Sequence, residues 1–297
     1  MERKKSYKTL NHEGILCNYK ISYWRGKCSA TPEDLGIINL DESVFHPGNK
    51  RLVDRKHLSG FSAIWVDTYK KLDNLSYSFF DSMTRFVPIR NVEKVEQLLE
   101  RKEDEFNTLK TSFLSLYSTM KTGWLEKHPE HYKALAPFYP SESCLSSKFN
   151  FSYSFFQITP PTLENLKSKE KKEQFERFRD KLRNQQEEFL SLALTDLRNK
   201  IQVKCTELIE NIQNGVAVRK DSILKLVNTF DDLNFMDDKE VEESLKTLKT
   251  SISNIEKVEK DDSVLRQNIS EIAQIVINTC QTEPEKVLGR YKRRIQL

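Results

Sequence analysis

Apolar residues recur at spacings of three and four, with one of seven, along the second half of the chain. Between residues 162 and 283 there is no proline, and Gly215 is the only glycine. Because these two residues interrupt helices most strongly, the stretch predicts extended amphipathic α-helix. Such a helix gains most of its stability when its apolar stripe is covered, by the rest of the chain, by another copy or by a different protein. The stripe comprises Phe175, Phe178, Leu182, Phe189, Ala193, Leu197, Ile201, Cys205, Leu208 and Ile212.

Three further amphipathic segments follow, at about residues 223–233, 241–255 and 265–279. Asn214-Gly215 suits a left-handed end of the preceding helix. Segments of this kind fit an antiparallel helical hairpin or a coiled-coil arm. Because the stripe drifts away from a strict repeat of seven, we expect bundle packing or local unwinding rather than an ideal two-stranded supercoil.

The first half of the chain contains two stretches with a period of two. In residues 15–23 and 149–155, apolar or aromatic side chains alternate with polar ones, which predicts two half-buried strands. We expect these strands to pair in a small antiparallel sheet backed by helices. The spacing of apolar residues predicts helices over about 54–75 and 91–127, and a short strand that ends at Pro88.

The double proline Pro160-Pro161 separates these two halves. Because proline ends both strands and helices, it favours a domain boundary at this point. The predicted domains are therefore an α+β N-terminal domain at 1–161 and a helical or coiled-coil arm at 162–297. The predicted fold class is mostly α, of the α+β type.

Composition narrows the class of protein only slightly. The chain has 297 residues, of which 37% are hydrophobic and 31% charged, which is enough for a buried core. The net charge of +4 is a small excess, unlike that of a dedicated nucleic-acid binder. Five scattered cysteines without a CxxC pair favour a reducing compartment. Without a signal-peptide core or an apolar run of roughly 18–20 residues, we expect a cytoplasmic protein with no membrane span.

Groups that could carry out chemistry are few. The Walker-type, GxGxxG, GxSxG and HExxH motifs are all absent. His128 and His131 lie close together, but Pro129 between them indicates a helix end rather than a metal site. His57 has acidic neighbours but no nucleophile nearby, and no sequence signal activates Cys144. We therefore expect no enzymatic activity, no catalytic or metal-binding residue and no cofactor.

Basic residues gather at both ends of the chain. At the C-terminus they surround an aromatic residue, and this combination can hold a nucleic-acid backbone while stacking a base. Solvated chain ends have the same composition, so both interpretations remain open. The candidate nucleic-acid contacts are Arg290, Tyr291, Lys292, Arg293 and Arg294.

Several short motifs between about Tyr19 and Pro161 occur in the order typical of a known family. They are Trp24-Arg25-Gly26-Lys27, Asp34-Leu35-Gly36, Leu58 with Phe61, Phe86-Val87-Pro88, Phe113-Leu114 with Tyr117, Trp124 with His128-Pro129-Glu130, and Phe149-Asn150-Phe151 leading to Phe156 and Ile158. In these residues the chain resembles the domain of unknown function numbered thirty-one fifty, found in phages, prophages and plasmids. Genes of that family often neighbour a MoxR-type AAA+ ATPase and a von Willebrand A-domain protein. The resemblance therefore implies a component of an ATPase-driven remodelling machine, and it offers no catalytic residues to carry over.

Together these observations favour a non-enzymatic interaction or adaptor subunit of a phage or mobile-element system. Its partner would be the MoxR-type AAA+ ATPase, the von Willebrand A-domain protein or a second copy of the chain. The alternatives are a nucleic-acid-binding protein that uses its basic termini, a phage structural or assembly protein, and an unrecognised enzyme. The predicted partner-binding stripe comprises Phe178, Leu182, Phe189, Leu197, Ile201, Leu208 and Ile212.

Overall fold

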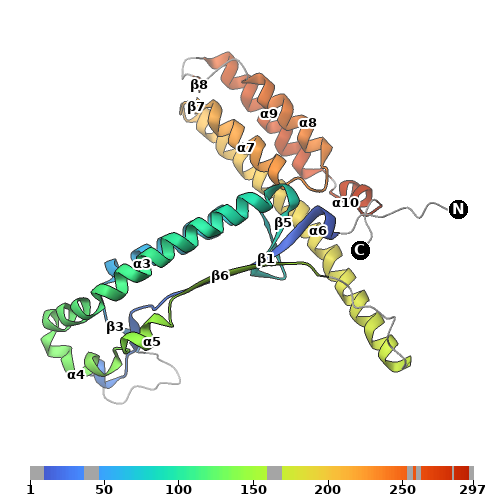
Figure 1. The fold of residues 1–297 in the computed structure, drawn as a ribbon. Coiled ribbons are helices and arrows are strands. Elements are labelled where there is room, and N and C mark those ends of the chain that lie inside the picture. Colours follow the sequence, from blue (N-terminus) through green and yellow to red (C-terminus); the bar gives the residue numbers. More distant parts are fainter. Residues whose placement is uncertain are drawn as a thin grey trace. The chain divides into compact units, whose positions relative to one another are not determined.

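A computed structural model describes residues 10–36, 47–158, 169–252, 257–258, 262–282 and 284–293 (Figure 1). The chain forms two compact units. The first, which we call the bundle unit, consists of Met1–Cys17, Asp73–Val95 and Phe155–Leu297, and the second, the aromatic unit, consists of Asn18–Leu72 and Glu96–Ser154. The predicted boundary at Pro160-Pro161 lies outside the described residues. The bundle unit takes residues from both sides of it, so these units do not follow that boundary.

A small antiparallel sheet has four strands in the order β4–β5–β1–β6. Strands β1 (Gly14–Ser22) and β6 (Asn150–Phe156) confirm the two strands predicted from the alternating pattern. They are neighbours in the sheet, as expected. Gly14 is needed where β1 approaches β5, because a Cβ atom there would lie only 2.4 Å from the carbonyl oxygen of Val87.

The strand predicted to end at Pro88 belongs to a hairpin. Strand β4 (Tyr77–Phe79) pairs with β5 (Asp81–Pro88), and Tyr77 lies opposite Phe86. Phe80 makes the turn with a left-handed φ of 63°. Bulky residues rarely adopt this conformation, so a phenylalanine at this position is unusual. Asp81 and Ser82, which follow it, are typical turn residues, and the carboxylate of Asp81 accepts hydrogen bonds from the backbone N–H groups of Met83 and Thr84.

The aromatic unit is built on the helices α2 (Ser59–Asp73) and α3 (Val92–Lys127), which confirm the two helices predicted in the first half. Its core centres on Phe61, whose ring centroid lies 5.3 Å from that of Phe106 and 4.9 Å from that of Phe149. Aromatic pairs at these distances contribute beyond the burial of their surface. The smaller elements are β2 (Lys27–Ser29), β3 (Asn49–Arg51), α4 (Tyr132–Leu135), α5 (Glu142–Ser146) and the 3-10 helices Glu33–Leu35, Arg55–His57, Pro129–His131 and Ala136–Phe138.

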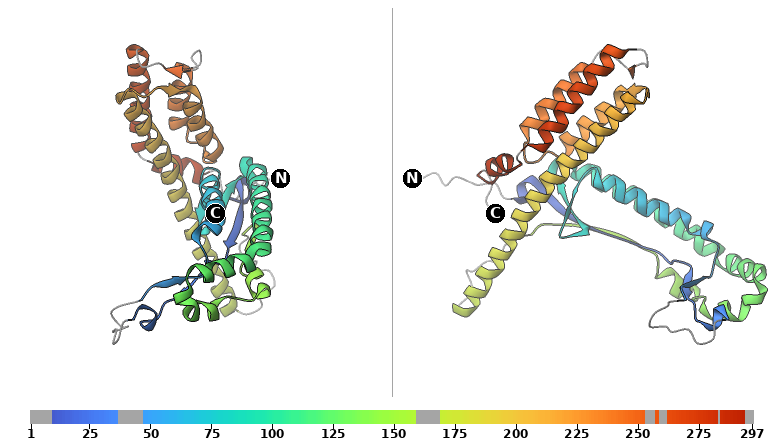
Figure 2. Two further views of the ribbon diagram at one scale, coloured as in Figure 1. Left: turned by 90° about the vertical axis from the view of Figure 1, so that its left-hand side faces the viewer. Right: turned by 180° about the vertical axis from the view of Figure 1, so that it is seen from behind.

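The bundle unit contains the predicted long helix, α6 (Lys169–Gln213), which is followed by Gly215 with the expected left-handed φ of 70°. Helix α9 (Ser263–Gln281) packs along α6, and α8 (Lys239–Ser251) packs along α9 (Figure 1 and Figure 2). Helix α7 (Lys220–Leu233) contacts both α6 and α8. Of the arrangements expected from the sequence, bundle packing is therefore the one that the described helices show. The smaller elements are α1 (Leu10–Glu13), the 3-10 helix Ile89–Asn91, β7 (Val218–Arg219), β8 (Lys257–Val258) and α10 (Glu285–Lys292).

The β4–β5 hairpin contributes aromatic rings to the core of this bundle. The ring centroid of Phe86 lies 5.1 Å from that of Phe189 on α6 and 5.0 Å from that of Phe235, which follows α7. The buried hydroxyl of Tyr77 donates a hydrogen bond of 2.8 Å to the carbonyl oxygen of Leu233. These contacts fix the hairpin against the middle of α6.

Candidate protein-interaction surface

The surroundings of helix α6 change along its length. From residue 171 to residue 185, a segment that we call the arm, every side chain is exposed or half-buried. Phe178 is 50% exposed, and the centroids of the Phe175 and Phe178 rings lie 6.0 Å apart. Further along the helix the same stripe enters the core of the bundle unit, where Leu197 is 0% exposed. The arm is thus the uncovered continuation of a covered stripe.

The charged residues around the apolar side chains of the arm are mostly basic. Residues 177–183 (Arg-Phe-Arg-Asp-Lys-Leu-Arg) hold four basic side chains and one acidic one. Arg183 forms an ion pair with Glu187 one turn along the helix, at 3.6 Å. In the described part of the chain, Arg177, Arg179 and Lys181 make no ion pair. The arm therefore has a local positive charge that an anionic partner would neutralise.

An exposed aromatic ring belongs to the hairpin that packs at the base of the arm. Phe189, the first apolar residue of the stripe to be buried, contacts Phe79 at a centroid distance of 4.7 Å. Phe80 lies 4.2 Å from Phe79, is 59% exposed and has the left-handed backbone of the hairpin turn. Strained backbone of this kind persists where the surroundings hold it, and it is concentrated at binding sites.

Helix α10 contacts α6 next to the C-terminal end of the arm. Lys292 forms an ion pair of 2.8 Å with Glu187 on α6, and this hydrogen bond lowers the pKa of the Glu187 carboxyl. Tyr291 is 1% exposed, and its ring centroid lies 5.8 Å from that of Phe235. On the N-terminal side of Glu187, the arm extends over about 22 Å, at 1.5 Å per residue.

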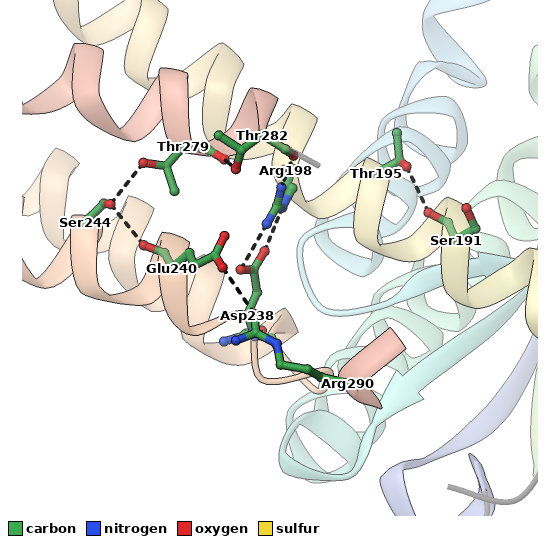
Figure 3. A network of polar contacts seen from close by, with 10 residues as sticks. Ser191, Thr195, Arg198, Asp238, Glu240, Ser244, Thr279, Thr282 and Arg290 are labelled. Carbon is green, nitrogen blue, oxygen red and sulfur yellow. Dashed lines mark hydrogen bonds and ion pairs between the residues drawn. The ribbon is translucent and has the colours of Figure 1, made fainter. Parts of the chain in front are cut away.

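A buried ion pair anchors the covered part of α6 (Figure 3). The guanidinium of Arg198 donates to both carboxylate oxygens of Asp238, at 2.7 and 3.2 Å, and to the carbonyl oxygen of Thr282 at 2.6 Å. The backbone N–H of Asp238 donates to the side-chain oxygen of Asn234 at 2.8 Å. Because its hydrogen bonds join α6, the α7–α8 turn and the end of α9, this pair sets how the helices meet. The side chains of Arg198 and Asp238 are 3% and 0% exposed, which indicates a structural role.

A second buried cation holds the β4–β5 hairpin. Arg85 is 1% exposed and donates to the carboxylate of Asp73 at 2.8 Å and to the hydroxyls of Ser76 and Ser78 at 3.0 and 2.8 Å. Burial raises the pKa of Asp73, but the hydrogen bonds from Arg85 and Lys200 outweigh it and leave the pKa below its usual value. The hydrogen bonds of Arg85 therefore also have a structural role, which is to hold the hairpin in place.

A groove of about 1020 Å³ lies between α6 and α7. Its floor includes the buried residues Ile201 and Leu208, and its rim carries charges of both signs. At the rim, Lys200 pairs with Asp73 and Asp196, at 3.1 and 2.9 Å. These charges neutralise one another, so the groove offers weaker charge recognition than the arm.

The histidines and Cys144 that were considered for chemistry all belong to the aromatic unit. His128 and His131 flank Glu130 at 3.9 and 3.4 Å in the 3-10 helix that follows α3, as expected of a helix end. Cys144 is exposed, whereas burial raises the pKa of the Cys17 thiol to about 12. Across the described residues, no three His, Cys, Asp or Glu side chains are placed to hold a metal ion. None of the described helices combines the length and apolar character needed to cross a membrane.

A comparison with known families identifies the first two thirds of the chain. Residues 12–214 match the family described as "Protein of unknown function (DUF3150)". The chain belongs to this family. No curated protein and no solved structure matches it. The match ends with α6, so it includes the arm and the covered stripe, while the helices α7 to α10 lie beyond it.

The structure divides the predicted partner-binding stripe into two groups. The first group is buried inside the bundle unit, where helices of the same chain cover it, and a partner cannot reach it while the bundle is folded. Of the three covers considered from the sequence, the chain itself is therefore the one observed for this group. The second group, Phe178 and Leu182, lies on the arm and remains a predicted contact. The buried group consists of Phe189, Leu197, Ile201, Leu208 and Ile212.

The predicted nucleic-acid contacts are not arranged as a binding strip. Tyr291 is in the core and cannot stack a base, and Lys292 forms an ion pair with Glu187. Arg290 lies 3.4 Å from Glu240, and Arg293 is exposed. Arg294 lies outside the described residues. The spacing of Val287, Leu288 and Tyr291 on one side of a short helix was the signal for a buried face.

Sequence reasoning also missed two parts of the surface. In the sequence, the basic residues of the arm form a charge run around Phe178. Their local excess over acidic residues was the available signal for a charged surface. Phe80 was missed because a bulky residue rarely occupies a left-handed turn position, although Asp81 and Ser82 beside it were an available turn signal.

Proposed function

We propose that this protein is a non-enzymatic interaction or adaptor subunit that binds another protein through the arm of α6. The observation that carries the proposal is the exposure of Phe178 on a helix whose stripe is buried from Phe189 onward. Exposed apolar surface that continues a core stripe is typical of interaction sites.

The energetics of the helix support the same conclusion. A helical segment without tertiary contacts is only marginally stable in water, because most helical stability comes from packing of the apolar face. The arm has no buried side chain of its own, and the covered part of α6 is the support that extends it. A partner that covered Phe175, Phe178 and Leu182 would supply the packing that the arm lacks.

The resemblance in the first half of the chain suggests which partners to try first. We propose a role beside a MoxR-type AAA+ ATPase and a von Willebrand A-domain protein, in the cytoplasm of a host that carries the phage or mobile element. The enzymes of that set would supply ATP hydrolysis, and this subunit would supply a docking surface.

Co-expression with the neighbouring ATPase and A-domain proteins tests the proposal. A tagged full-length chain is used to recover its partner from the lysate, and Phe178→Asp is compared with Leu116→Asp. Leu116 is a matched control because it is 55% exposed on helix α3 of the other unit. We expect Phe178→Asp to lose the partner and Leu116→Asp to keep it, since only the first change places a charge in the docking face.

Two results would contradict the proposal. In one, neither neighbour is recovered and light scattering shows a monomer. In the other, Phe178→Asp recovers the same amount of partner as the unchanged chain.

A further inference from the structure

We infer that the arm binds an amphipathic helix of another protein whose apolar stripe is flanked by Asp and Glu residues. This inference rests on the proposed function and goes further by naming the chemistry of the partner. It depends on the apolar spacing of the arm, on the charges beside that stripe and on the ring of Phe80.

The apolar residues of the arm have the spacing of a helix–helix seam. Phe175, Phe178 and Leu182 follow one another at three and four residues, which places them on one side of the helix. They continue in register with the stripe that α9 and its neighbours cover further along α6. A second helix laid along the arm would therefore pack in the same way as the helices of the bundle.

The positions beside this stripe carry one sign of charge. In a seam of this kind, the residues that flank the apolar positions on either side select the partner by their charge. On the arm these positions hold Lys172, Arg179 and Lys181, together with the neutral Gln174. No acidic residue occupies a flanking position of the arm, so acidic side chains on the partner would complete the seam.

The same charges disfavour a second copy of this chain as the partner. An antiparallel copy that paired Phe178 with Leu182 would bring Arg179 close to the Arg179 of the second copy. It would also bring Lys181 close to the second Lys181. Like charges at such positions destabilise association, so these side chains oppose self-pairing of the arm.

The hairpin supplies a wall for the docked helix. The exposed ring of Phe80 rests on Phe79, which packs on Phe189 at the base of the arm. A helix that followed the arm towards the bundle would reach this ring. Large aromatic side chains are frequent anchors of protein interfaces, and an aliphatic residue at the end of the partner helix would bury it.

Photo-cross-linking identifies the occupant directly. The full-length chain, with p-benzoylphenylalanine in place of Phe178, is expressed together with its neighbouring genes and irradiated. Mass spectrometry then identifies the attached peptide. We expect a peptide of another protein that has apolar residues at spacings of three and four and acidic residues beside them.

Charge reversal tests why that peptide binds. The doubly changed chain Arg179→Glu with Lys181→Glu should lower the cross-link yield at least tenfold, and higher salt should lower the yield of the unchanged chain. The control is Arg101→Glu, at an exposed position of helix α3, which should leave the yield unchanged. Circular dichroism of each variant confirms that its helices are retained.

Several outcomes would overturn the inference. A cross-linked peptide from this same chain would show self-association, and a product removed by nuclease would show nucleic acid on the arm. A protein peptide with neutral or basic flanks, or a yield unaffected by the charge reversal, would reject the acidic helix while the proposed function stands. Absence of any cross-link, together with unchanged partner recovery by Phe178→Asp, would reject both.

Discussion

The arm and the covered part of α6 are two stretches of one helix with one apolar stripe. In the arm Phe178 is 50% exposed, whereas Leu197 in the covered part is 0% exposed. Both stretches show the same spacing of three and four, so the spacing alone does not distinguish them. What differs is the presence of other helices: α9 and its neighbours pack along the covered part only. Periodicity thus defines the face of a helix that must be covered, and long-range contacts decide what covers it.

The two stretches also differ in how their polar residues are satisfied. The covered part contains Arg198, whose hydrogen bonds reach two other segments of the bundle unit. The arm contains Arg179 and Lys181, which make no ion pair in the described residues. The charged side chain of the covered part is therefore paired within the chain, whereas those of the arm are available to pair with a partner.

The largest effect should come from charging the covered stripe. Leu197→Asp places an unpaired carboxylate in the core, and we expect the free energy of unfolding of the bundle unit to fall by more than about 4 kcal/mol. Phe178→Asp on the arm should change it by less than about 0.5 kcal/mol. Urea unfolding followed by circular dichroism measures both. If Leu197→Asp leaves too little folded protein, Leu197→Ala should cost about 3 kcal/mol; equal effects at the two positions would refute the comparison.

Breaking the buried ion pair should have the next largest effect. Asp238→Ala leaves the guanidinium of Arg198 buried without its carboxylate, so we expect a loss of about 3–5 kcal/mol in the free energy of unfolding. Glu240→Ala removes the partner of Arg290 at the surface and should cost less than about 1 kcal/mol. The same urea titrations compare them. A small loss for Asp238→Ala would mean that Arg198 finds other partners, and the pair would then not set the helix arrangement.

Much of this fold follows from local patterns in the sequence. The alternation in residues 15–23 and 149–155 predicted two neighbouring strands. The absence of proline between residues 162 and 283 predicted the long helix, and Gly215 predicted its end. These features depend on side chains within one or two turns of each other, which periodicity reports directly.

Features that depend on distant residues did not follow. Arg198 and Asp238 are 40 residues apart, and no sequence pattern predicts their contact. Tyr291 among basic residues resembled a stacking residue, yet its position on the apolar side of α10 places it in the core. Asp81 and Ser82 are usual turn residues, but the left-handed position before them holds the bulky Phe80, and one strand was expected where two occur. In each case tertiary contacts outweighed the local preference.

A moderate effect should appear at Asp73, and it should depend on pH. Asp73 accepts hydrogen bonds from Arg85 and Lys200, and its pKa in the folded chain is lowered from 3.8. Asp73→Asn should cost about 1–3 kcal/mol at pH 7, because a charged hydrogen bond is lost. A lowered folded pKa means that the carboxylate stabilises the fold above the unfolded pKa. That contribution disappears as the pH falls through the folded pKa. Urea unfolding at pH 7, 5 and 3 should show the two chains converging only at the lowest pH; a constant difference would contradict this.

The smallest change in stability is expected for Phe178→Cys. Thiol labelling of this variant compares the two stretches most directly. In a chain with Cys28→Ser and Cys144→Ser, Phe178→Cys places a thiol on the arm, while Cys205 remains in the covered part. Burial raises the pKa of the Cys205 thiol to about 12, so almost no reactive thiolate is present at pH 8. One thiol should therefore react with Ellman's reagent at the rate of an unfolded peptide, and the three buried thiols, Cys17, Cys205 and Cys280, only after urea is added.

Protection of the new thiol would have a specific meaning. If its reaction slowed as the protein concentration rose, a second copy would cover the arm, contrary to the charges of Arg179 and Lys181. If it slowed only when the neighbouring proteins were added, the arm would be covered by a partner, as proposed. Rapid labelling of Cys205 in the native chain would show that the bundle does not cover α6, and the distinction between the two stretches would be lost.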